Sequence, residues 1–256
     1  MSTLFSMMSP ETFALAFAIA LLAGFIKGMV GFAMPMILIS GLSSFIDPQL
    51  ALAGLILPTV ATNGWQALRQ GRAAAWESVK RFRVFMMIGL VTMLLSAQLV
   101  RVLSAETMLL LIGVPVSVFA LIQMYGLRLV LPEKGRGLIE AAIGGFAGLI
   151  GGMSGVWGPP TVLYLTALNT PKTEQVRIQG VIYGLGAVAL LFGHIGSGIV
   201  NRDTVVFSAA LLIPALLGTW VGFRVHDRID QVAFRRVTLL VLFVAALNLV
   251  RRGLMG

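Results

Sequence analysis

The sequence predicts an all-α polytopic membrane protein made of two homologous halves, and three observations carry this prediction. Hydrophobic residues make up 58% of the 256 residues, charged residues make up 11%, and the mean hydropathy is +0.95. A water-soluble globular protein would not have this composition. The apolar runs are continuous rather than alternating, which excludes a β-barrel and predicts spanning helices. Finally, one glycine-rich motif occurs twice along the chain.

The repeated motif is GFIKGMVGFAMP at residues 24–35 and GLIGGMSGVWGP at residues 148–159. A match of this length at a constant offset of 124 residues favours duplication over chance. Both copies join a cluster of glycines to a proline inside a long apolar run, so each predicts a broken or re-entrant helix within the membrane. The matching positions include Gly24, Gly28, Met29, Gly31 and Pro35 with Gly148, Gly152, Met153, Gly155 and Pro159.

Both halves follow one plan, in which a broken first region precedes three ordinary transmembrane helices. The first repeat, residues 1–125, has its broken region at 11–46, and the second repeat, residues 138–256, has its broken region at 138–168. A solvent linker at 126–137 joins them, and together they form one integral membrane domain. The remaining apolar runs are close to the length that crosses a bilayer. These predicted spans are residues 51–68, 84–100, 107–125, 178–192, 204–223 and 237–250.

The basic residues predict the orientation of the two halves. If each broken region enters and returns, or makes two tilted passes, fourteen of the nineteen Lys and Arg residues lie on one side, in predicted loops at 69–83, 126–137, 172–177 and 223–236. If each region crosses once, the division is eleven to seven. The positive-inside rule therefore favours inverted-topology repeats with both termini outside. Charges spread over short loops also argue against nucleic acid as a partner, despite the net charge of +9.

The broken segments predict a binding site for an anion. Pro35 and Pro159 fit the first turn of a new helix, where a missing amide is tolerated, and the residues just before them would supply free amides. We expect donors at 31–34 and 155–158, because helix N-termini attract negative charge. Two such ends near the membrane centre would resemble the sites of secondary transporters. The alternative is that the glycine pairs spaced four apart in both motifs only pack helices together.

Lys27 is the most informative charge, because it lies inside an apolar run with no acidic residue in the ten positions that follow it. Burial of an ammonium group is costly, so such a residue usually faces a cavity and has a partner. The functional interpretation is a counter-charge for an anion, and the alternative is a lysine that snorkels to the membrane interface. Its counterpart in the second half is Gly151, so the two halves should contribute unequally.

The candidate site residues come from both motifs and from polar positions on the following helices. Thr59, Thr62, Asn63 and Gln66 have helical spacing and predict a polar stripe, which hydrogen bonding between helices explains equally well. The predicted substrate-binding residues are Lys27, Gly28, Gly31, Phe32, Met34, Gly152, Ser154, Gly155, Trp157 and Gly158. The secondary candidates are Asn63, Gln66, Tyr164 and Gln179.

Several residue types that other functions need are missing from the predicted membrane interior. All ten acidic residues lie near ends or loops of the predicted spans, so we expect no centrally buried carboxylate. There is no cysteine and no nucleotide-binding loop. We therefore expect no metal, no cofactor and no enzyme active site, since no recognisable set of nucleophile, base and acid is present.

At these motifs the chain resembles the sulfite exporter TauE/SafE family of bacterial membrane permeases. The resemblance covers essentially the whole chain and rests on GFIKGMVGFAMP and GGMSGVWGPP, with the segments DPQLALA and TPKTEQVR that follow them. It implies two related halves in the bacterial inner membrane, and transport of a small anion such as sulfite, an organosulfonate or a carboxylate by alternating access. The alternatives left open are a passive anion channel or facilitator and a non-transporting membrane assembly factor. The oligomeric state is not predicted.

Overall fold

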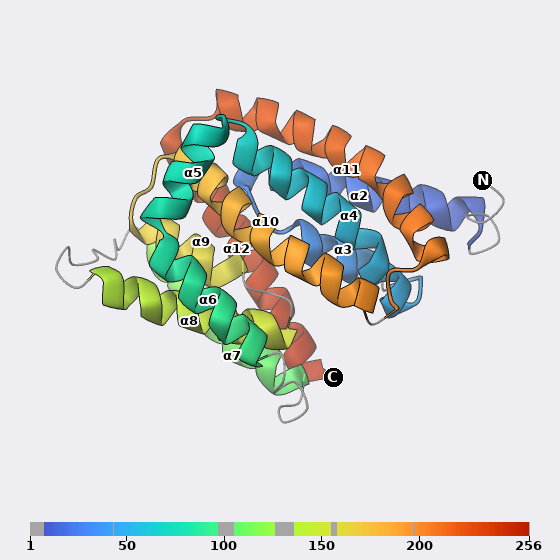
Figure 1. The fold of residues 1–256 in the computed structure, drawn as a ribbon, viewed down its shortest axis with the longest axis horizontal. Helices are drawn as coiled ribbons and strands as arrows, with labels where there is room; N and C mark the ends of the chain where they lie inside the picture. The colour runs from blue at the N-terminus through green and yellow to red at the C-terminus, as the bar shows by residue number, and fades with distance from the viewer. Residues whose placement is uncertain are drawn as a thin grey trace. The chain divides into compact units, whose positions relative to one another are not determined.

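The computed structural model describes residues 8–42, 44–96, 105–125, 136–154, 158–196 and 198–255, and these residues contain α-helices and no β-strand (Figure 1). The all-helical prediction is confirmed for this part of the chain. The helices are α2 (Pro10–Val30), α3 (Met34–Leu42), α4 (Pro48–Leu68), α5 (Arg72–Arg81), α6 (Arg83–Ser96), α7 (Ala105–Met124), α8 (Arg136–Ser154), α9 (Gly158–Ala167), α10 (Lys172–Gly196), α11 (Arg202–Arg228) and α12 (Gln231–Met255).

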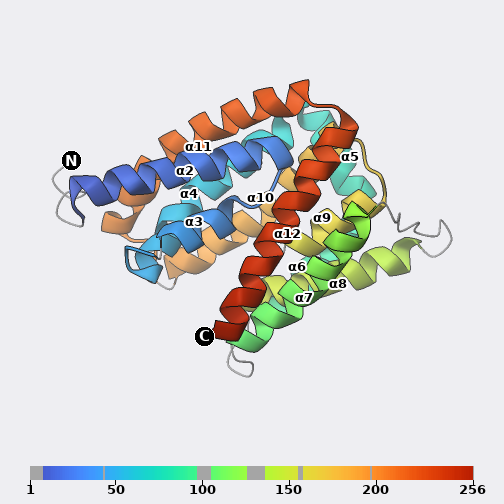
Figure 2. The same cartoon turned by 180° about the vertical axis from the view of Figure 1, so that it is seen from behind.

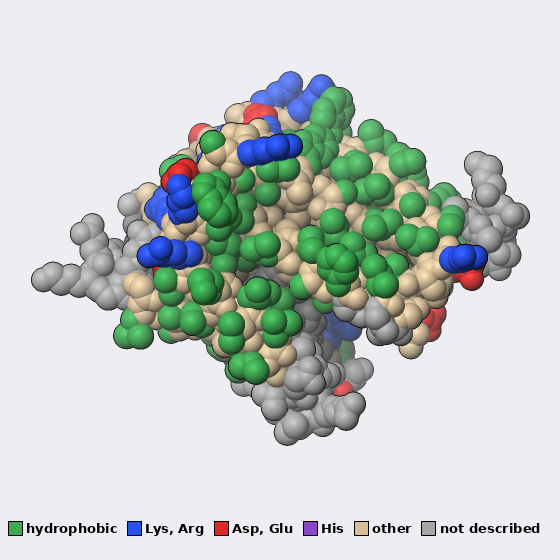
Figure 3. All heavy atoms as spheres, in the orientation of Figure 1, with side chains coloured by type: hydrophobic (Ala, Val, Ile, Leu, Met, Phe, Trp, Pro, Cys, Tyr) green, Lys and Arg blue, Asp and Glu red, His purple; other side chains and the backbone are tan. Residues whose placement is uncertain are grey.

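Four of the described helices are long and apolar enough to cross a membrane. Each buries between 33% and 50% of its most apolar window inside the protein, so much of its apolar surface remains available to lipid. The visible face in Figure 3 is dominated by hydrophobic side chains, and charged side chains on it are few. The protein is therefore a membrane protein. These candidate spans are Pro10–Val30, Lys172–Phe192, Arg202–Arg228 and Gln231–Met255.

The helices form two compact units, and neither unit coincides with one half of the sequence. The first unit contains Met1–Ala75 and Val176–Asp230, and the second contains Trp76–Gln175 and Gln231–Gly256. Each unit thus combines helices from before and after the linker at 126–137. The first unit holds α2, α3 and α4 with most of α10 and all of α11, whereas the second holds α6, α7, α8, α9 and α12.

In the first unit, α2 packs along α11 through glycines on both helices, and the two run side by side in Figures 1 and 2. A Cβ atom built at Gly24 or Gly28 would overlap a backbone carbonyl oxygen of α11. Gly218 and Gly222 of α11 would clash in the same way with carbonyl oxygens of α2. These two small-xxx-small pairs let the backbones approach closely, which is how helices associate in lipid.

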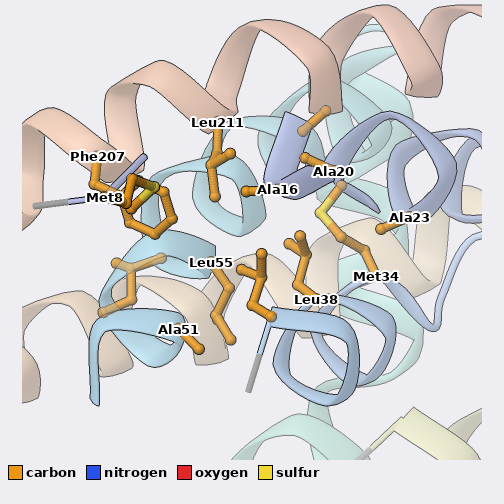
Figure 4. Packing of buried hydrophobic residues seen from close by; sticks show 13 residues of the cluster. Met8, Ala16, Ala20, Ala23, Met34, Leu38, Ala51, Leu55, Phe207 and Leu211 are labelled. Carbon is orange, nitrogen blue, oxygen red and sulfur yellow. The ribbon is translucent and has the colours of Figure 1, made fainter. Parts of the chain in front are cut away.

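The hydrophobic core of the first unit lies between α2, α3, α4 and α11. In Figure 4, small side chains of α2 such as Ala16 and Ala20 face the larger side chains of the neighbouring helices. Leu38 of α3, Leu55 of α4 and Leu211 of α11 fill the space that the alanines leave. Alternation of small and large side chains across the layers gives the close packing that interiors require, and it fixes α3 beside α2 directly after the break between them.

In the second unit, glycines again allow two helix backbones to approach closely. Its helix α8 packs on α6, where a Cβ at Gly144 or Gly148 would meet backbone atoms of Phe85 or Gly89. Helix α12 packs on α7. Gly148 is the counterpart of Gly24 at the 124-residue offset, so the first helix of each motif approaches its partner at the same position.

Several predicted loops are helical, and these predictions were wrong. The basic segment 69–83 contains α5 and the start of α6, residues 172–177 belong to α10, and most of 223–236 belongs to α11 or α12. For 172–177 and 223–236 the physical reason is that a helix continues past the apolar run that marks its membrane portion, whereas α5 is a separate, largely polar helix. Charged residues in the terminal turns of such a helix extend beyond the apolar core, and their low hydropathy suggests a loop.

Pro58 interrupts the hydrogen bonding of α4, and Ser208 of α11 repairs it. Because proline has no amide hydrogen, the carbonyl oxygen of Gly54 lacks its usual donor four residues later. The Ser208 hydroxyl donates to this oxygen at 3.1 Å and accepts from the amide of Leu57, also at 3.1 Å. A neighbouring helix thus satisfies the backbone groups that a proline frees in an apolar environment.

Ser208→Ala should lower the free energy of unfolding by about 1–2 kcal/mol, because it leaves the buried carbonyl oxygen of Gly54 without its donor. Thermal unfolding of the purified protein measures the effect. The matched control is Ser44→Ala, which removes an exposed hydroxyl bonded to the Ser40 carbonyl and should change stability by less than about 0.5 kcal/mol. Equal effects of the two substitutions on stability would contradict the role of Ser208 as the partner of the backbone groups that Pro58 frees.

Candidate functional site

The first motif forms a break between α2 and α3. Helix α2 ends at Val30 with Gly31 as its cap, at φ 88° and ψ −2°, and α3 begins at Met34. Ala33 also has a positive φ of 75°, which is uncommon for a residue with a side chain. Three residues therefore reverse the chain inside the first unit, and Pro35 occupies the first turn of α3 as the sequence predicted.

The carbonyl groups released at the end of α2 are taken up by donors within the first unit. The Lys27 oxygen accepts from the Gly31 amide at 2.6 Å. The Met29 oxygen lies 3.1 Å from His226 Nδ1, which must carry the proton because a carbonyl can only accept. Gln66 Nε2 reaches the Gly31 oxygen at 3.0 Å.

Gln179 of α10 completes this cap. With its nitrogen toward the break, the orientation that satisfies both ends of its carboxamide, it donates to the Val30 oxygen at 3.1 Å and to the Gly31 oxygen at 3.2 Å. A Cβ at Gly31 would overlap the Gln179 side chain. Glycine is therefore required at this position both by its positive φ and by the close approach of Gln179.

The amides on the other side of the break remain available. Within the described part of the chain, the amide groups of Phe32, Ala33 and Met34 have no hydrogen-bond acceptor. The prediction that the donors begin at Gly31 was wrong, because the Gly31 amide closes the last turn of α2. The break thus has satisfied acceptors and unsatisfied donors, which is the polarity that suits a negatively charged ligand.

Lys27 lies one turn before the break and is only 1% exposed. Its amine donates to the Asn63 side-chain oxygen of α4, and no carboxylate among the described residues forms an ion pair with it. The snorkelling alternative is therefore wrong, since the side chain is enclosed by protein. An ammonium group can donate three hydrogen bonds, and one neutral partner does not offset the loss of water.

The predicted polar stripe on α4 is present and buried. Thr59 and Thr62 direct their hydroxyls to carbonyl oxygens of their own helix, at 2.6 Å in each case. The Thr62 hydroxyl also lies 3.6 Å from the sulfur of Met34. Asn63 and Gln66 instead reach across to the break. The structure therefore brings together six predicted residues, which are Lys27, Gly31, Met34, Asn63, Gln66 and Gln179. We call these six residues the break cluster.

The other predicted residues of the first motif have different surroundings. Gly28 lies against Thr219 and Gly222 of α11, so the packing alternative describes its contacts. Phe32 is a buried residue of the break itself. In the second motif, Gly152 lies in α8, which ends at Ser154, and Gly158 begins α9. Gly155 and Trp157 lie outside the described residues.

Tyr164 belongs to the second unit, where its hydroxyl donates to Glu140 at 3.2 Å. Its ring stacks on Phe85, with 5.8 Å between the ring centroids. Glu140 is 5% exposed, so it is buried within the protein although it lies near the end of a helix, as the sequence predicted. Glu140 lies in the second turn of α8, at the edge of an apolar run, and its sequence position alone suggested contact with water. The Tyr164 hydroxyl instead contacts it inside the second unit.

His226 was also missed by sequence reasoning. It lies near the end of α11 and is fully buried against the end of α2. A histidine close to several arginines reads as part of a basic loop. The signal that could have identified it is the helix pairing, because Gly218 and Gly222 on α11 place the following turn beside the break.

The sequence that forms the break cluster matches one known protein family. The family described as sulfite exporter TauE/SafE matches residues 16–249 of the chain, nearly its full length. The chain belongs to the TauE/SafE family. Neither a curated protein nor a solved structure is detectably similar to it. Membership in TauE/SafE agrees with the resemblance carried by the duplicated motif.

TauE/SafE proteins are transporters, so the family points to a membrane permease or exporter of sulfur anions rather than to an enzyme. It also implies a small anionic substrate. In this TauE/SafE chain, the match includes both motifs and all six residues of the break cluster. The cluster therefore lies in the part of the chain that the family shares.

Proposed function

We propose that the chain is a secondary transporter that moves a small anion, such as sulfite, an organosulfonate or a carboxylate, across the bacterial inner membrane by alternating access. The observation that carries this proposal is the enclosed amine of Lys27, with one neutral partner, beside the unsatisfied amides of Phe32, Ala33 and Met34. An anion at this position would supply the missing negative charge and the missing acceptors together.

The capping of the α2 carbonyls supports the choice of an anion over a cation. A cation site at a broken helix would use the freed carbonyl oxygens as ligands. Here the Met29, Val30 and Gly31 oxygens already accept hydrogen bonds from buried side chains. A positively charged ligand would compete with those donors and would meet Lys27, so the cluster favours the opposite charge.

The helix boundaries support the further proposal that the halves are inverted-topology repeats. Helix α2 ends at Val30 and α8 at Ser154, while α3 begins at Met34 and α9 at Gly158. Both pairs of positions are separated by 124 residues, the offset of the duplicated motif. The distribution of Lys and Arg favours the same arrangement, with the basic segments at 69–83 and 126–137 on the cytoplasmic side.

Flux measurements in liposomes test the proposed function. The purified full chain should accumulate labelled sulfite against its gradient when a proton gradient is imposed, whereas protein-free liposomes should not. Flux that only dissipates a sulfite gradient would identify a passive facilitator instead. Absence of both flux and stabilisation by the anions tested would indicate the membrane assembly factor, since a ligand that binds the native state raises thermal stability.

A further inference from the structure

One acceptor in the break cluster has no donor, and it belongs to Gln66. The residue is 1% exposed, and its Nε2 donates to the Gly31 oxygen at 3.0 Å and to the Val176 oxygen at 2.6 Å. Two carbonyl partners fix which end of the carboxamide is nitrogen. Its Oε1 is therefore an acceptor, and among the described residues no donor reaches this buried atom.

A buried acceptor without a partner is unusual, because its lost hydration is not replaced. The other three polar side chains of the break cluster each have a partner: Lys27 donates to Asn63, and Gln179 donates to the Val30 and Gly31 oxygens. Gln66 Oε1 therefore has no hydrogen-bond donor, although the other polar side chains of the break cluster are hydrogen-bonded. A ligand that has acceptors but no hydrogen-bond donor would also leave Gln66 Oε1 without a partner.

Gln66 and Lys27 are linked through the same few residues. Gln66 follows Asn63 by three positions on α4, so the two side chains share a helix face. Asn63 accepts from Lys27, and Gln66 donates to Gly31, the residue that caps the helix carrying Lys27. Lys27 and Gln66 are therefore both linked to the end of α2, where the proposed anion would bind.

We propose that this site selects a singly charged anion that carries its own O–H or N–H group, with Lys27 on its negative oxygen and Gln66 Oε1 accepting its hydrogen bond. The inference rests on the proposed anion transport and specifies its substrate class. For a diprotic acid such as sulfurous acid, the bound form is the monoanion rather than the dianion. The substrate then carries a proton with it, and no side chain has to relay one.

Matched pairs of monoanions test the selection on the full wild-type chain. Sulfamate and methanesulfonate have the same charge and nearly the same shape, but only sulfamate has N–H donors. Glycolate and propionate form a second pair, in which only glycolate carries a hydroxyl. Competition against labelled sulfite uptake should show that the donor-bearing member of a pair binds about tenfold more tightly, because it satisfies a buried acceptor.

Equal affinities within both pairs, or a preference for methanesulfonate and propionate, would overturn the selection while leaving anion transport intact. Failure of sulfite and of all four probes to bind would instead refute the proposed function. Gln66→Met, which removes the acceptor, should bring the ratio within a pair to about one, whereas the wild-type ratio is about ten. Gln49→Met, at an exposed position at the start of the same helix, should keep the wild-type ratio. If Gln66→Met does not fold, the wild-type comparison still decides the question.

Discussion

Replacement of Lys27 by methionine is expected to lower anion affinity by at least about tenfold, since a charge-assisted hydrogen bond contributes roughly 1.5–3 kcal/mol. The same substitution should leave the ligand-free protein at least as stable as the wild type. Methionine removes the desolvation cost of an enclosed ammonium group, which amounts to several kcal/mol. That gain exceeds the roughly 1–3 kcal/mol lost when the Asn63 oxygen has no donor. Sulfite uptake and thermal unfolding measure the two effects.

The control for Lys27 is Lys80→Met, because Lys80 is exposed on α5 and pairs only with the nearby Glu77 among the described residues. It should change neither sulfite uptake nor stability appreciably. Loss of uptake together with a large loss of stability in Lys27→Met would show that Lys27 is structural. Unchanged uptake in a stable Lys27→Met variant would show that the charge of Lys27 is not part of the anion-binding site.

Replacement of Gly218 by alanine should destabilise the protein by about 1–3 kcal/mol, the usual effect of overpacking a close contact. The new Cβ would overlap the Leu21 carbonyl oxygen, and the backbone of α2 has no flexible end that can move aside. Separation of α2 from α11 would also pull His226 away from the Met29 oxygen. Reduced thermal stability, with weaker sulfite binding, is the expected measurement.

Gly64→Ala provides the matched control for this substitution. Gly64 lies inside α4, and apart from the adjacent residues and the backbone of its own helix no atom lies within 4 Å of a Cβ built there. Alanine has a higher helix propensity than glycine, by roughly 1 kcal/mol. Gly64→Ala should therefore be neutral or stabilising, and a similar loss of stability in both variants would show that the glycine contacts between α2 and α11 do not determine stability.

The features of this fold that follow from local sequence could be predicted, and those that depend on the partner helix could not. The break before Pro35 was predicted because a proline and a glycine cluster act on their own segment. The stripe from Thr59 to Gln66 was predicted because helical spacing places these residues on one face. In both cases the chain carries the signal within a few turns.

Other features depend on contacts between distant segments. Gly28 fits both a ligand and a helix neighbour, and only the presence of Gly222 opposite it shows which contact forms. The burial of Glu140 was not predicted, because nothing near it in sequence reveals the contact with the Tyr164 hydroxyl. Gly31 looked like a free donor because sequence does not show that its amide closes the turn on Lys27.

The pairing of α2 with α11 also has a consequence for biosynthesis. Helix α2 leaves the ribosome before α11, which follows after both motifs and the linker have been made. During that interval the glycine surface of α2 has no α11 to cover it. Until α11 has been synthesised and inserted, α2 must therefore remain in the membrane without this packing partner, or be bound by an insertion factor. A chain cut at the linker should be rescued only when both pieces are synthesised together, because each piece holds the missing helix of the other.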